Sequence, residues 1–149
     1  MNNPMRSKLT FKQSILAGLL AGLVAAVINA LLFFVFHSAG VISDTIYPQP
    51  NQPLTVLPVL IASLVPALLG SVVFFLLETY TNNGFRIFAI LSLVLMVLSM
   101  YSPFTGIPGV TTGYALALCL MHITVPLALL YFIRRAKQKK QATDPVRTA

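Results

Sequence analysis

The stretch SILAGLLAGLVAAVINALLFFVF, residues 14–36, carries no charged side chain over 23 consecutive positions. At a rise of about 1.5 Å per residue, a helix of this length spans roughly 35 Å, which exceeds the ~30 Å hydrocarbon core of a bilayer. Its apolar residues run continuously and do not alternate with polar ones, which argues against a transmembrane strand. The stretch therefore predicts a transmembrane helix.

Three further apolar segments extend this prediction to most of the chain: residues 55–77, 85–101 and 112–133. The third segment is the shortest, so it should stand more upright in the bilayer or borrow flanking residues. The chain is 57% hydrophobic and 9% charged, with a mean hydropathy of +0.86, so its charges cannot cover the surface of a soluble domain. We therefore expect an integral membrane protein.

The expected fold class is all-α, with 149 residues leaving room for one compact domain. We predict a four-helix transmembrane bundle over residues 14–133, whose antiparallel helices alternate up and down. A basic cytoplasmic arm, residues 1–13, precedes the bundle. A basic cytoplasmic tail, residues 134–149, follows it and is expected to lose order beyond about residue 140.

The positive charges predict which helix ends face the cytoplasm. All ten Lys and Arg residues lie before residue 14, at Arg86 or after Ile133. Lys and Arg collect on the cytoplasmic side, so both termini and the short turn at 79–84 should be cytoplasmic. The basic start would also suit a cleaved signal peptide, but the apolar run is too long and no A-x-A site follows it. We interpret the first segment as a retained helix.

Small residues on the first segment predict how helices pack. Gly18, Gly22 and Ala26 recur at four-residue spacing and form one small-residue face. Because lipid tails are as apolar as leucine, transmembrane helices associate through close backbone approach, which small residues permit. This face serves either the bundle of a single chain or a homodimer, and the sequence leaves both alternatives open.

A few polar residues lie inside the apolar segments, where polar groups are costly and are therefore candidates for function. By helical rise they fall at similar depths, and we predict a polar layer in the middle and outer half of the bundle. It comprises His122, Asn29, Cys119, Ser63 and Ser99.

His122 has three interpretations. It is a structural histidine bonded to Asn29 or to a serine across the bundle, a ligand or proton site, or a metal ligand. Its pairing with Cys119 three residues earlier is weak evidence for metal, because a closed zinc site usually has four ligands. Cys119 is the only cysteine, so no internal disulfide is expected.

Two prolines interrupt the predicted helices near mid-membrane. Pro66 and Pro126 have no N–H, so the carbonyls of Ala62 and His122 lose their helical partners, and both helices should bend. Freed backbone groups at similar depth, together with the polar layer, predict a small polar cavity opening toward the outer loops.

Two charged residues flank the predicted inner turn. The simplest interpretation of Glu78 and Arg86 is a salt bridge between them or a contact with a lipid headgroup. The basic tail should attract anionic lipid headgroups at the cytoplasmic face of the bilayer. Nucleic acid is not an expected partner, since the tail has no interleaved aromatic residues.

Three short motifs carry a resemblance: FRIF at 85–88, SPF at 102–104 and MHITVP at 121–126. Through these motifs the chain resembles a family of small bacterial membrane proteins with four predicted helices, catalogued as a domain of unknown function. The resemblance covers residues 14–133. The resemblance implies a bacterial plasma membrane location and no established activity. The chain is also similar in size to small multidrug transporters. It lacks their essential acidic residue in the first helix, where it offers only Asn29, which argues against proton-coupled drug export.

No catalytic constellation is found: there is no nucleophile with base and orienter, no paired carboxylates and no metal motif. We therefore expect a protein that is not an enzyme and has no cofactor. One hypothesis is an interaction or accessory subunit that pairs with a membrane protein or with itself. The alternative is a binder or carrier of a small, mostly apolar molecule, using the polar layer around His122 and Asn29.

Overall fold

The computed structural model describes residues 8–143, and these form an all-α structure. The prediction of four packed apolar helices is confirmed, and each is long and apolar enough to cross a membrane. The third of these spans consists of α3 and the one-turn helix α4 together. The helices are α1 (Phe11–Ser38), α2 (Val56–Tyr80), α3 (Gly84–Ser99), α4 (Ser102–Thr105) and α5 (Thr112–Thr143).

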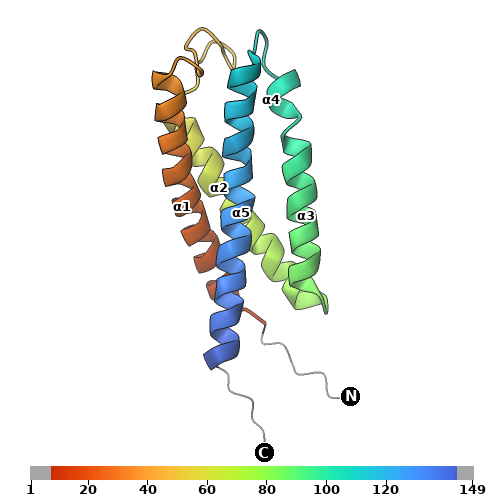
Figure 1. Ribbon diagram of the computed structural model, residues 1–149. Coiled ribbons are helices and arrows are strands. Elements are labelled where there is room, and N and C mark those ends of the chain that lie inside the picture. Colours follow the sequence, from red (N-terminus) through yellow and green to blue (C-terminus); the bar gives the residue numbers. More distant parts are fainter. Residues whose placement is uncertain (1–7, 144–149) are drawn as a thin grey trace, which may run out of the picture.

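The long helices run in alternating directions along the chain (Figure 1). The start of α1 and the end of α5 therefore lie at the same end of the bundle, which also holds the α2–α3 turn (Figure 1). We call this the inner end, and the opposite end the outer end. Helix α1 packs closely against α2 and α5, whereas α3 is the most loosely held long helix and buries only Gly84 and Phe88.

Small residues let α1 and α2 approach closely. A Cβ atom on Gly18 would overlap the side chain of Ser71, and one on Gly22 would lie 3.2 Å from the Cβ of Ala67. Ala26 is buried on the same helix. The small-residue face of α1 thus packs against α2 of the same chain, as close backbone approach requires.

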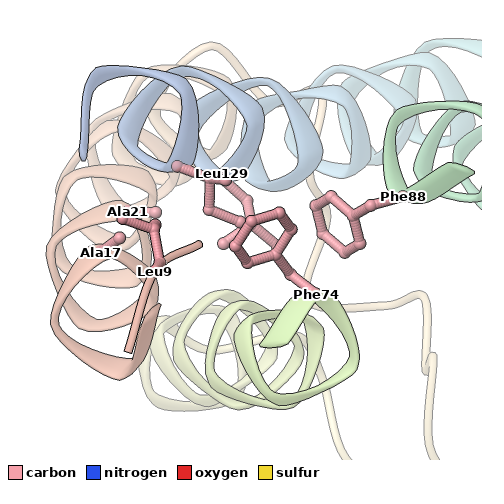
Figure 2. Packing of buried hydrophobic residues seen from close by; sticks show 7 residues of the cluster. Leu9, Ala17, Ala21, Phe74, Phe88 and Leu129 are labelled. Atoms are coloured by element: carbon pink, nitrogen blue, oxygen red, sulfur yellow. The ribbon is translucent and has the colours of Figure 1, made fainter. Parts of the chain in front are cut away.

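An aromatic contact attaches α3 to this pair of helices. Phe74 of α2 is fully buried, and its ring meets that of Phe88 edge to face, with centroids 5.4 Å apart. Figure 2 shows both rings beside Leu129 of α5 in one apolar cluster. The cluster lies toward the inner end, so α3 is held mainly by its first turns.

The first helix begins three residues earlier than the apolar run suggested. Thr10 is its N-cap and forms a capping box: its Oγ1 accepts from the Gln13 N–H at 3.3 Å, and the Gln13 side chain accepts from the Thr10 N–H at 3.0 Å. A capping box satisfies N–H groups that a helix end leaves free. The polar residues Lys12 and Gln13 therefore fit within the first turn of α1.

The ends of the third and fourth predicted helices also differ from the expected ones. The third helix ends at Ser99, and the motif SPF begins the one-turn helix α4, because proline is well suited to a first helical turn. Helix α5 continues past Ile133 to Thr143, where a tail was expected. Contacts hold this extension: Lys137 pairs with Glu78, and Lys140 donates to the carbonyl of Lys8.

Candidate functional site

A cavity of about 750 Å³ lies between α2, α3 and α5. We call it the central cavity. Helix α3 lines it with residues from Phe88 to Ser99, and only Gly84 and Phe88 of this helix are buried. Most of its lining is apolar, and Pro66 and Pro126 both contribute to it. The polar side chains along it are Asn29, Gln49, Ser63, Ser92, Ser99 and His122.

Asn29 links three helices at one edge of the cavity. It is 3% exposed, and its Nδ2 donates to Ser63 Oγ at 3.0 Å and to the Met121 carbonyl at 3.1 Å. Since a carbonyl only accepts, the Met121 contact determines which end of the amide carries the hydrogens. Ser63 in turn donates to the Val59 carbonyl of its own helix at 2.8 Å. Asn29 Oδ1 has no hydrogen-bond partner within residues 8–143.

His122 is not bonded to this group, so the interpretation that it binds Asn29 or a serine is wrong. Its Nδ1 lies 2.8 Å from the Leu118 carbonyl of its own helix. Asn29 instead bonds the backbone of Met121, the residue before the histidine. Because the Leu118 carbonyl only accepts, Nδ1 must carry a proton, and in the neutral form of the ring Nε2 is then an acceptor. His122 is half-buried and lines the cavity.

The other two members of the predicted polar layer, Ser99 and Cys119, differ in whether they line the central cavity. Ser99 lines the cavity and donates to the Met96 carbonyl of its own helix at 2.7 Å. Cys119 is buried with its Sγ 3.6 Å from the Met100 carbonyl, outside the cavity lining. Within the described part of the chain, no three His, Cys, Asp or Glu side chains gather closely enough to hold a metal ion.

The loop between α1 and α2, residues 39–55, which we call the outer loop, contributes cavity residues that the sequence did not indicate. Ile42 and Ile46 of this loop are buried in a cluster with Phe33 and Tyr114 at the outer end. This packing brings the loop over the bundle, so that Gln49 lines the central cavity. Nothing in the proline-rich loop sequence indicated which of its residues would face inward.

At the inner end, the predicted pairing of Glu78 with Arg86 is wrong. Glu78 is 4% exposed and forms its salt bridge with Lys137 of α5. The helical extension of α5 brings Lys137 beside the last turn of α2. Gly84 packs directly on the backbone of Glu78, so a Cβ atom at position 84 would overlap it. The side chain of Arg86, two residues further on, is exposed.

Comparison with known proteins places the chain by its sequence. Residues 10–139 match the model of a family of unknown function, DUF6069. The chain belongs to the DUF6069 family. No curated protein and no solved structure matches it.

Membership agrees with the resemblance to a small membrane protein family of unknown function and assigns no activity. The matched residues contain all four apolar spans of this DUF6069 member up to Lys139. Four such helices in one chain indicate a multi-pass membrane protein.

Proposed function

We propose that this protein binds or carries a small, mostly apolar molecule in the central cavity. The observation that carries the proposal is the cavity itself, about 750 Å³ with a mainly apolar lining and a few polar groups. Ligand sites are typically concave, of about 300–1,000 Å³, and combine apolar walls with a small number of polar groups that orient the ligand.

The polar groups define the chemistry of the ligand. His122 offers Nε2 as an acceptor, because Nδ1 is engaged with the Leu118 carbonyl. Ser63 and Asn29 already bond one another, so they support the cavity edge. A ligand with an apolar body and one hydroxyl or N–H donor would satisfy Nε2 without placing a charge in the membrane.

The membrane location and orientation are part of the proposal. The resemblance to small bacterial membrane proteins supports a bacterial plasma membrane location, and the positive-inside rule supports cytoplasmic positions for both termini. The inner end would then face the cytoplasm and its anionic lipid headgroups, and the outer loop would face away from it. In this orientation a ligand would lie nearer the outer loop, whose residues Gln49 and Leu54 line the cavity.

The accessory-subunit hypothesis has less support. It rested on the small-residue face of α1, and that face is covered by α2, where Gly18 meets Ser71. A membrane partner or a second copy would have to use another surface. We also propose that the protein is not an enzyme, because its sequence offers no nucleophile with base and orienter and no paired carboxylates.

Photolabelling tests the proposal. A long-chain alcohol that carries a diazirine would be irradiated with the protein in lipid nanodiscs, and adducts located by peptide mass spectrometry. We expect adducts on residues lining the central cavity. Ala62→Phe, which fills the cavity, should abolish them, whereas Leu31→Phe on the exposed face of α1 should not.

A matched alkane diazirine without the hydroxyl tests the role of His122. His122→Leu should lower labelling by the alcohol about tenfold, the effect of one lost hydrogen bond in an apolar site, and leave labelling by the alkane unchanged. Adducts spread evenly over lipid-facing residues, and insensitive to Ala62→Phe, would contradict the proposal.

A further inference from the structure

A second cavity, of about 310 Å³, lies at the inner end of the bundle, far along α2 and α5 from His122. It lies where α2 ends and α3 begins, with α5 and Lys8 closing its sides. We call it the inner cavity. Most of its lining residues are polar or charged, and the full set is Lys8, Glu78, Thr81, Asn82, Asn83, Gly84, Phe85, Arg86, Lys137 and Gln141.

We infer that the inner cavity binds a phosphate group. Three cationic side chains, Lys8, Arg86 and Lys137, line it against the single carboxylate of Glu78. That carboxylate is buried and already neutralised by Lys137 through a direct ion pair. The cavity therefore retains the charge of two cations with no second acid among its lining residues.

The two remaining cations are placed differently. Lys8 donates to the Thr79 carbonyl at 2.9 Å, which holds its ammonium group beside the α2–α3 turn. Arg86 makes no side-chain hydrogen bond or ion pair with any residue of the described range 8–143. A guanidinium presents N–H donors in a planar fork that suits phosphate oxygens, so Arg86 is the principal ligand in this inference.

The backbone adds donors at the same place. Helix α3 starts at Gly84, and its N-cap, Asn83, makes no side-chain hydrogen bond to the first turn. The N–H groups of an uncapped first turn remain available, and helix N-termini attract anions. The amide side chains of Asn82 and Gln141 add further donors around the cavity. Cations, amides and helix N–H groups together are the donor types that bind phosphate.

The depth of the inner cavity agrees with a phosphate. It lies between Tyr80, the last residue of α2, and Gly84, the first of α3, where two apolar spans end. Phospholipid phosphates lie at this level, just outside the hydrocarbon core. The phosphate is therefore that of an anionic lipid headgroup or a soluble phosphate, and the same side chains would hold either.

Binding in lipid-free detergent tests the inference. Purified protein would be titrated with two probes, short-chain phosphatidylglycerol and inorganic phosphate, and the Kd measured by thermophoresis. Diacylglycerol with the same chains is the control ligand, because it can occupy the central cavity but carries no phosphate. We expect a phosphate-bearing probe to bind and diacylglycerol not to compete with it.

Variants locate the site. Arg86→Gln should weaken binding about tenfold, the loss expected for one charge-assisted hydrogen bond, and Lys8→Gln should weaken it in the same direction. Lys139→Gln is the matched control, because this lysine is exposed on the same end of α5 but does not line the cavity. The Lys139→Gln variant should have a Kd within about twofold of the wild-type value, since exposed charges interact weakly.

The outcomes distinguish a lipid headgroup site, a soluble phosphate site and the absence of a phosphate site. Arg86-dependent binding of phosphatidylglycerol alone identifies a headgroup site, and Arg86-dependent binding of inorganic phosphate identifies a soluble ligand. Equal weakening by Arg86→Gln and Lys139→Gln would overturn the inference, since it indicates diffuse surface charge. Absence of binding by both probes would also overturn it. None of these results depends on the central cavity, so the proposed function is tested separately.

Discussion

At the level of single residues, the side chain of Asn29 connects three helices in the membrane-spanning region. Its amide joins α1 to Ser63 of α2 and to the Met121 backbone of α5. His122, the more conspicuous residue in the sequence, bonds only within its own helix. Asn29 is thus mainly structural, whereas the ring of His122 keeps an atom available for a ligand.

Asn29→Ala should destabilise the bundle by about 1 kcal/mol, the typical value for interhelical hydrogen bonds in membranes. Ser63→Ala should cost less, because the Met121 contact survives. The measurement is unfolding in mixed micelles, with both single variants and the double variant forming a cycle. A coupling energy of zero between Asn29 and Ser63 would contradict the 3.0 Å hydrogen bond as a stabilising contact.

At the scale of helices, the α1–α2 interface depends on the absence of side chains. Gly18→Ala should destabilise the protein by about 1–3 kcal/mol, the usual cost of overpacking, because its Cβ would overlap Ser71. Gly22→Ala should cost less, since its nearest neighbours are 3.2 Å away. Thermal unfolding in detergent measures both, and a Gly22→Leu variant should also give less folded protein.

Ser71→Gly provides the control for this interface. It removes the side chain that a Cβ at position 18 would meet, so it should restore part of the stability lost in Gly18→Ala. If Gly18→Ala melts at the wild-type temperature, the two helices do not approach as closely as the structure describes.

The helices also differ in how firmly they are held. Helix α3 is attached through Phe88 near its start and leaves space along its remaining length. Helix α5 is longer than its apolar part and brings Lys137 to Glu78. The loosely held part of α3 lines the central cavity, and the extension of α5 lines the inner cavity with Lys137 and Gln141.

For the whole molecule, we expect both termini and the α2–α3 turn to face the cytoplasm. In a Cys119→Ser background, a membrane-impermeant maleimide should label Thr45→Cys in intact cells, because this residue is exposed in the outer loop. Asn82→Cys, exposed in the α2–α3 turn, should be labelled only after the membrane is permeabilised. The reverse pattern would contradict the orientation, whereas the fold and both cavities would be unaffected.

The sequence by itself determined the fold class and the positions of the four helices. Continuous apolar runs of this length satisfy backbone hydrogen bonds only as helices in a membrane, so this conclusion needs no tertiary information. The sequence was also sufficient to select four candidate site residues, because each is a polar residue or a proline inside an apolar run. These are Pro66, Pro126, Asn29 and His122, and all four line the central cavity. The boundaries were less certain, because a helix such as α5 can continue into water beyond its apolar part.

Only the tertiary structure decided which of these residues meet. Glu78 pairs with Lys137, 59 positions away, and not with nearby Arg86, because that choice depends on how far α5 extends beside α2. Asn29 binds the Met121 backbone and not His122, because side-chain direction across a bundle depends on helix rotation. The central cavity is lined by α2, α3, α5 and the outer loop, which are far apart in the sequence. Spacing along one helix can indicate a packing face, but it does not say which residue of a distant helix that face meets, because the packing of distant segments determines this.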